Sequence, residues 1–261
     1  MLAEFLDIDL TLWQLAIILV AGLVTGAVNT LAGSGSLVTL PIFIFLCGLP
    51  APVANGTNRI GVILQSAVSV FNFRKHGNLP LEGVGWLLGP SIAGSLIGSL
   101  LAVDMSSTLM YRIIGGLMIF MLGIVLLKPK RWLTPGIPDP SRHRQPLTLL
   151  IFTIIGLYGG IIQAGVGIFL LSALVLRGRY NLIQANALKS LAVLVFNIPA
   201  IIVFIAHDQV HWGYGAIMAV AQMGGAVLGT RFAIRVPNAA QYIRYLLILI
   251  LIAAAVKFFL R

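Results

Sequence analysis

Long stretches of this chain contain apolar residues and no charged side chain, and this feature limits the fold more than any other. Leu12–Leu31 and Leu246–Val256 are two such stretches. A helix needs about 20 mostly apolar residues to cross a bilayer. Only 9% of the 261 residues are charged, whereas a typical soluble domain has about a quarter. The sequence therefore predicts an all-α integral membrane protein.

The apolar stretches form two halves joined by a polar connection. We expect a first transmembrane half at 1–127, a basic connection at 128–146 and a second half at 147–261. The ten predicted segments are 11–32, 36–48, 53–73, 81–103, 108–127, 147–163, 167–177, 182–206, 211–230 and 240–260. The second and seventh are short, because twelve helical residues rise only about 18 Å and the hydrocarbon core is about 30 Å thick. We expect these two to be half-helices that meet a break inside the membrane.

Basic side chains gather in alternate connections between the segments. The net charge is +10, and this distribution is typical of cytoplasmic loops rather than of a nucleic-acid-binding surface. We expect a multi-pass membrane protein with 128–146 in the cytoplasm and both termini on the other side. The lipid bilayer is then its surroundings, and no nucleic acid is a partner.

The two halves share landmarks at a nearly constant spacing. Asn55 and Asn186, Gly94-xxx-Gly98 and Gly225-xxx-Gly229, and Tyr111 and Tyr242 are each 131 positions apart. Because each half has an odd number of segments, the second half would enter the membrane upside down. The sequence thus predicts two inverted-topology repeats, an architecture of transporters. We interpret the glycine pairs as contacts that let helices pack closely.

Glycines interrupt the apolar run at matching places in the two halves. Inside a helix glycine costs roughly 1 kcal/mol relative to alanine, so two close together indicate that the helix stops. Unwound backbone inside a membrane is tolerated only where protein covers it or a polar cavity meets it. We therefore expect both breaks to bind substrate, through Asn29, Gly33, Ser34, Gly35 and Ser36 in the first half and Gln163, Gly165 and Gly167 in the second.

Polar side chains follow each break, and two of them are cations. Arg59 and Lys189 lie near the starts of matching segments. A charge within a spanning segment is costly and usually faces a cavity on a ligand path. Together with helix N-termini, which favour anions, they indicate a site for an anion built from Asn55, Thr57, Asn58, Arg59, Asn186 and Lys189. The alternative is that both cations reach towards a membrane interface.

Several functions are disfavoured by residues that the segments lack. The acidic side chains all lie near segment ends or in connections, so no carboxylate could relay a proton in the middle of the membrane. No histidine lies inside a segment and no P-loop sequence is present, so we expect neither an enzyme nor a nucleotide-driven pump. His207, Asp208 and His211 fit a solvated turn better than a metal site. We expect no cofactor and no metal.

The glycine motifs resemble those of a known family. The motifs are Gly22-xxx-Gly26 leading into Ala32-Gly33-Ser34-Gly35 and Pro41, and Gly156-xxx-Gly160 leading into Ala164-Gly165-Val166-Gly167 and Ala185-Asn186. Over nearly the whole chain this pattern resembles the sulfite exporter TauE/SafE family. The usual glycine triplet of that family is interrupted here by Ser34 and Ser36, and by Val166 and Ile168.

The resemblance implies a permease for sulfur-containing or organic anions, such as sulfite, sulfoacetate or related sulfonates, in the inner (plasma) membrane of a bacterial cell. We expect a secondary transporter that exports a small anion by alternating access of its two halves. An inside-negative potential of 100 mV contributes about 2.3 kcal/mol for each negative charge that leaves. The alternatives are an anion channel, an importer coupled to an ion, and a membrane scaffold that binds a partner protein. A homo-oligomer is a further option.

Overall fold

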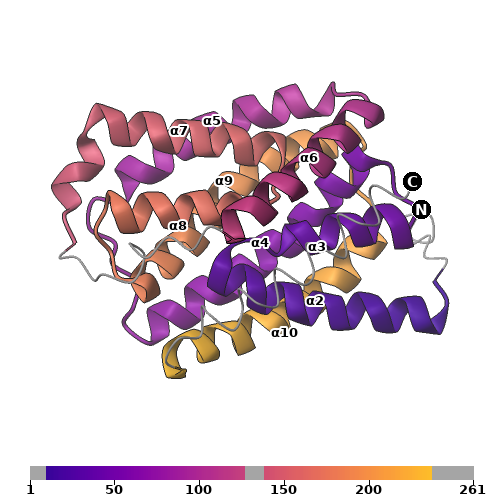
Figure 1. Ribbon diagram of the computed structural model, residues 1–261, viewed down its shortest axis with the longest axis horizontal. Helices are drawn as coiled ribbons and strands as arrows, with labels where there is room; N and C mark the ends of the chain where they lie inside the picture. Colours follow the sequence, from indigo (N-terminus) through magenta and orange to yellow (C-terminus); the bar gives the residue numbers. More distant parts are fainter. Residues whose placement is uncertain (1–9, 127–137, 237–261) are drawn as a thin grey trace.

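The computed structural model describes residues 10–126 and 138–236, and the elements in these ranges are helical (Figure 1). They are α2 (Leu12–Ala32), α3 (Ser36–Pro41), the π-helix η1 (Ile42–Leu46), α4 (Ala51–Lys75), α5 (Gly85–Val103), α6 (Ser107–Leu126), the 3-10 helix η3 (Pro140–Arg144), α7 (Pro146–Ile161), α8 (Val166–Leu176), α9 (Leu182–Ala206) and α10 (Trp212–Arg235). The prediction of an all-α fold is confirmed. The tenth predicted segment, 240–260, lies outside the described residues.

Four of the described helices are long and apolar enough to cross a membrane, namely α2, α5, α9 and α10. The helix α4 is as long as α9, at 25 residues. It falls outside that group because polar side chains interrupt its apolar sequence, and many of them are buried inside the protein. The most polar of the long helices therefore lies where other helices, rather than lipid, surround its polar residues.

The helices pack in pairs that combine the two halves of the chain. In Figure 1, α5 and α7 run along the top, α2 and α10 along the bottom, and α4 and α9 lie between them. The most extensive interfaces are α5 with α7 and α10 with α2, followed by α10 with α4, α4 with α9 and α5 with α9. If each helix is exchanged for its counterpart in the other half (α2 for α7, α4 for α9 and α5 for α10), the same set of contacts results. Such an exchange is what two repeats would produce, and the inverted relation of the repeats stays a prediction.

Glycines allow the two outer helix pairs to approach at backbone distance. A Cβ on Gly94 of α5 would lie 2.1 Å from the carbonyl oxygen of Thr153 in α7. On the opposite side, a Cβ on Gly225 of α10 would lie 2.0 Å from the carbonyl oxygen of Leu23 in α2. These motifs therefore hold the protein's own helices together, as small residues four apart do in membranes.

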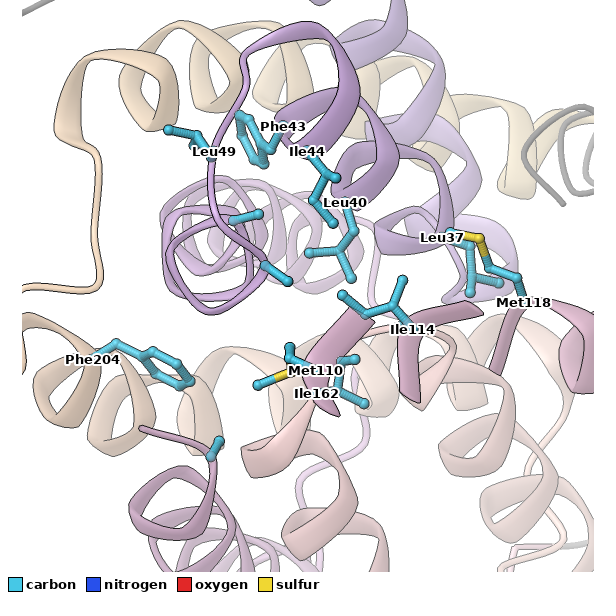
Figure 2. Packing of buried hydrophobic residues seen from close by; sticks show 14 of the residues in the cluster. Leu37, Leu40, Phe43, Ile44, Leu49, Met110, Ile114, Met118, Ile162 and Phe204 are labelled. Atoms are coloured by element: carbon cyan, nitrogen blue, oxygen red, sulfur yellow. The ribbon is translucent and has the colours of Figure 1, made fainter. Parts of the chain in front are cut away.

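The second predicted segment, 36–48, is not one regular helix. The α-helix α3 ends at Pro41 and the chain continues as the π-helix η1. Proline lacks the N–H that an α-helix requires and its ring clashes with the preceding turn, so the regular hydrogen-bond pattern is lost here. Figure 2 shows the apolar side chains of this segment against α6, with Leu37 beside Met118 and Leu40 facing Ile114.

The helix η3, in the connection between the halves, contacts both of them. His143 is buried, with Nδ1 3.2 Å from the carbonyl oxygen of Gly83 and Nε2 3.2 Å from the hydroxyl of Tyr180. Gly83 precedes α5 and Tyr180 precedes α9. Burial lowers the pKa of His143 below its ordinary value, against the raising effects of the Gly83 carbonyl, Asp139 and Glu82. A neutral histidine therefore joins the two halves at this end of the protein.

Candidate functional site

The two glycine breaks meet at the level of the backbone. The helix α2 ends at Gly33, with φ of +71°, and α8 begins after Gly165, with φ of +72°. The N–H of Gly167 donates to the carbonyl oxygen of Gly33 at 3.0 Å. A Cβ on Gly33 would lie 2.3 Å from the Cα of Gly167, so no side chain fits there. The structure thus brings the two predicted breaks to one crossing point.

Lys189 lies close to this crossing, at the last turn of α2. It is buried, and its Nζ donates to the carbonyl oxygens of Asn29 and Thr30, both at 2.7 Å, and to Oδ1 of Asn186 at 2.9 Å. The two carbonyls belong to the last turn of α2, where helical carbonyls run out of partners within the helix; that of Asn29 also accepts from the N–H of Gly33 at 2.9 Å. The C-terminal end of a helix also carries a partial negative charge, which a cation stabilises. Lys189 of the second half therefore caps a helix of the first half.

Arg59 occupies the corresponding place at the end of α7. Its Nη2 donates to the carbonyl oxygen of Gly160 at 2.6 Å and its Nη1 to Oδ1 of Asn197 at 2.9 Å. The guanidinium lies 4.6 Å from the ring centroid of Phe204, and its Nε has no hydrogen-bond partner. Asn55 supports the same helix end, since its Nδ2 donates to the carbonyl oxygen of Ile161 at 2.8 Å. Arg59 of the first half therefore caps a helix of the second half.

A small polar cavity adjoins Lys189. The space open to the centre of a water molecule is about 10 Å³, which is roughly room for one water. Its wall consists of Asn29, Thr30, Gln65, Ser66, Ser69, Lys189, Ser190 and Val193. The wall thus combines one cation with hydroxyl and amide groups and includes no carboxylate, which is the chemistry that suits a small anion. Oε1 of Gln65 is buried and has no hydrogen-bond partner among the residues that the structure describes.

Sequence reasoning found only part of this wall. Asn29 and Lys189 were predicted as substrate-binding residues, and Thr30, Ser66 and Ser69 were not. The hydroxyls of Thr30 and Ser69 lie 2.9 Å apart and join α2 to α4. The available signal was the spacing of Gln65, Ser66 and Ser69, because residues three and four apart share one face of a helix.

Other predicted site residues hold the first break in place. Nδ2 of Asn58 donates to Oγ of Ser36 at 2.9 Å, and Oδ1 of Asn58 accepts from the hydroxyl of Thr39. The N–H of Gly35 donates to Oδ1 of Asn29 at 3.4 Å. The N–H groups of Gly35 and Gly167, which lie at the two breaks predicted to bind substrate, therefore have partners within the protein.

The remaining predicted residues lie apart from the cavity wall. Thr57 accepts a hydrogen bond from the N–H of His211 at 2.8 Å, in the connection before α10. Ser34 and Gln163 are buried beside the two breaks, and Oγ of Ser34 and Oε1 of Gln163 have no hydrogen-bond partner. Among the residues that the structure describes, no three side chains that commonly bind metals gather in one place.

Comparison with known proteins identifies the class. The chain is 28% identical over 251 residues to the probable membrane transporter protein ORF9 of Sinorhizobium sp., covering 95% of this chain and 94% of the relative. It is 26% identical over 228 residues to a probable membrane transporter protein of Haemophilus influenzae, with 85% and 86% covered. The probable membrane transporter protein YfcA of Escherichia coli is 25% identical over 224 residues, with 84% and 81% covered. No solved structure matches the chain.

The apolar helices and the names of these relatives indicate a multi-pass membrane transporter. Within that class, residues 18–258 match the sulfite exporter TauE/SafE family, and the chain belongs to this family. The resemblance inferred from the glycine motifs is therefore confirmed. Membership of this family places the protein in a lipid bilayer and implies that its substrate is a small molecule.

Proposed function

We propose that this protein is a secondary transporter that exports a small sulfur-containing or organic anion, such as sulfite, sulfoacetate or another sulfonate, across the inner membrane. The observation that carries the proposal is the polar cavity at Lys189, which lies beside the last turn of α2 close to the crossing of the two breaks. The proposed orientation has both termini outside the cytoplasm and the connection 128–146 inside.

In this proposal the substrate competes with the end of α2 for Lys189. The ammonium now holds the carbonyls of Asn29 and Thr30. A helix end presents about half an elementary charge, whereas an anion presents a full one. An anion that enters the cavity therefore draws Nζ away from the carbonyls and loosens the last turn of α2 from α9. Substrate binding is thereby linked to a movement between the two halves.

Alternating access then follows from the way the halves are joined. We propose that 1–127 and 147–261 are inverted repeats that rock against each other around the crossing of Gly33 and Gly167, as inverted-repeat transporters do. At the crossing the backbones of Gly33 and Gly167 lie directly against each other, so no Cβ of either residue stands between the helices when they pivot. The membrane potential favours the exit of an anion by about 2.3 kcal/mol per charge and 100 mV.

Thermal unfolding of the purified protein in detergent tests the substrate site. Sulfite, thiosulfate, sulfate, sulfoacetate, taurine and acetate would each be added to the wild-type protein and to Gln65→Leu. A ligand at one hundred times its Kd stabilises the fold by about 2.7 kcal/mol. We expect a shift with one sulfur-containing anion, and we expect Gln65→Leu to lose it, because the substitution replaces an amide on the cavity wall with an apolar side chain. Ser172→Ala is the matched control, since Ser172 bonds only to its own helix, at the carbonyl of Ile168.

A shift that both variants keep would place the substrate elsewhere, and no shift with any anion would count against an anion transporter. Single-channel currents far above carrier turnover would favour the channel. The scaffold has less support, because the glycines proposed to bind a partner are already packed within the protein: Gly94 and Gly98 against α7, and Gly225 and Gly229 against α2.

A further inference from the structure

Lys189 has a set of hydrogen-bond partners that only its protonated form can satisfy. An ammonium group has three N–H donors and no acceptor, and Nζ faces three oxygens, those of the Asn29 and Thr30 carbonyls and of the Asn186 side chain. A neutral amine has two N–H donors and a lone pair. Loss of one proton would remove one of these three donors and would turn the lone pair towards an oxygen; of the two carbonyls, that of Asn29 has a further backbone donor, the N–H of Gly33 at 2.9 Å. The tie between α9 and the end of α2 therefore depends on one proton.

Within residues 10–126 and 138–236, the surroundings of Lys189 contain no other ionisable group that could take this role. The helices α2, α8, α5 and the rest of α9 carry no ionisable side chain, and Tyr158 of α7 is bonded to the carbonyl of Ala164. From α4, Arg59 is turned towards Gly160, and Arg74 and Lys75 are exposed at the helix end. Arginine keeps its proton in proteins, whereas a buried lysine exchanges its proton readily.

The cavity has room for a water molecule that could accept this proton. It has room for roughly one water, and the hydroxyls of Thr30 and Ser69 are already linked to each other at 2.9 Å. Oε1 of Gln65 is an acceptor without a partner on the same wall. A water in the cavity would therefore find both donors and acceptors beside Nζ.

We propose that Lys189 binds and releases one proton in each transport cycle, so that the anion and the proton cross the membrane together. This inference rests on the proposed function and adds the coupling ion to it. Once the anion has drawn Nζ away from the carbonyls of α2, the anion is what stabilises the ammonium, and its departure from that state removes the stabilisation. The N–H bond then breaks, the proton passes to a cavity water to form hydronium, and the electron pair stays on Nζ as the lone pair of the amine. Reloading reverses these steps.

The consequence for transport is a fixed charge balance. A dianion such as sulfoacetate leaves with one proton, and the pair carries one net negative charge. The inside-negative potential therefore still favours export. With the potential clamped at zero, efflux should make the inside of a vesicle alkaline by one proton for each anion.

Proteoliposomes loaded with sulfoacetate and a pH-sensitive dye test this coupling, with potassium and valinomycin clamping the potential. We expect wild-type efflux to be matched by alkalinisation of the lumen. Lys189→Arg keeps a cation but cannot release its proton, so it should lose at least tenfold in net efflux while still exchanging labelled for unlabelled sulfoacetate. The matched control is Lys75→Arg, the same substitution at an exposed lysine, which should behave like the wild type.

The outcomes separate the two proposals. Wild-type efflux without a change of lumen pH, or net efflux by Lys189→Arg at the wild-type rate, would overturn the proton coupling and leave the anion transporter intact. The absence of both efflux and exchange in the wild type would overturn the proposed function and the coupling with it.

A second measurement leaves Lys189 unchanged, in case the arginine variant does not fold. Ser69→Cys, in a background where the single cysteine is removed by Cys47→Ala, places a thiol on the cavity wall. Leu81→Cys supplies an exposed reference thiol. We expect the labelling rate at position 69, divided by that at position 81, to change several-fold between mildly acidic and mildly alkaline pH. A constant ratio would contradict the proposal.

Discussion

The Lys189 region and the Arg59 region contain the same kind of contact, a cation bound to the end of a helix, but the two cations have different surroundings. Lys189 of the second half binds the last turn of α2 at the carbonyl of Asn29. Arg59 of the first half binds the last turn of α7 at the carbonyl of Gly160. These two carbonyls are 131 positions apart, as the repeat predicts. Only Lys189 is found on the wall of the polar cavity, while Arg59 lies against an aromatic ring.

The residues at matching positions explain this difference. Gln65, Ser66 and Ser69 line the cavity in the first half, and the positions 131 further along are Phe196, Asn197 and Ala200. Phe196 is buried in an apolar cluster and Asn197 accepts a hydrogen bond from Arg59. Apolar packing therefore fills the space beside Arg59, while hydroxyl and amide groups beside Lys189 leave room for roughly one water. A buried charge in a membrane protein is thus a tie or a ligand site depending on its neighbours.

The largest expected effect comes from Gly33→Ala, which disturbs the crossing that the two regions share. The new Cβ would lie 2.3 Å from the Cα of Gly167, on a backbone with φ of +71°. Left-handed backbone costs a side-chain-bearing residue about 1–2 kcal/mol and overpacking about 1–3 kcal/mol. Thermal unfolding should show that the free energy of unfolding falls by roughly 2–5 kcal/mol, or that the variant does not fold. Gly116→Ala, in open space, is the control, and equal stability of the two variants would show that the crossing is not tight.

Methionine substitutions of the two cations should separate the regions. Arg59→Met leaves the Gly160 carbonyl and the Asn197 side chain without this donor in a packed environment, which should cost about 1–3 kcal/mol. Lys189→Met leaves its three oxygens beside a cavity that water can enter, so its loss of stability should be smaller. Transport should show the opposite order, with Lys189→Met inactive. Melting temperatures and efflux measured on both proteins check this, and a larger loss of stability in Lys189→Met would contradict the comparison.

The smallest effect concerns His143, which joins the halves outside both regions. Burial lowers its pKa below the ordinary 6.5, so the unfolded chain takes up the proton at a higher pH than the folded protein does. The contribution of His143 to stability is therefore complete above pH 6.5 and declines as the pH falls towards the lowered pKa. Melting curves should show this decline in the wild type and a weaker one in His143→Gln. An equal decline in both proteins would mean that other groups cause it.

Much of the local structure could be predicted from the residues alone. The first nine predicted segments fall on helical structure, and the backbone is left-handed at both predicted breaks, Gly33 and Gly165. The prediction of one regular helix over 36–48 was wrong beyond Pro41, where the chain becomes a π-helix. The predicted role of Arg59 and Lys189 in binding an anion stays a prediction, because both cations already have partners within the protein.

The sequence by itself determined that this chain is a helical membrane protein and where its helices break. The physical reason is that inside a bilayer each helix must satisfy its own backbone hydrogen bonds, so apolar length and glycine position are local signals. The tertiary structure alone decided that Gly33 meets Gly167, that each cation caps a helix of the other half, and that a cavity opens beside Lys189. Those contacts join residues more than one hundred positions apart, and the packing of whole helices brings them together.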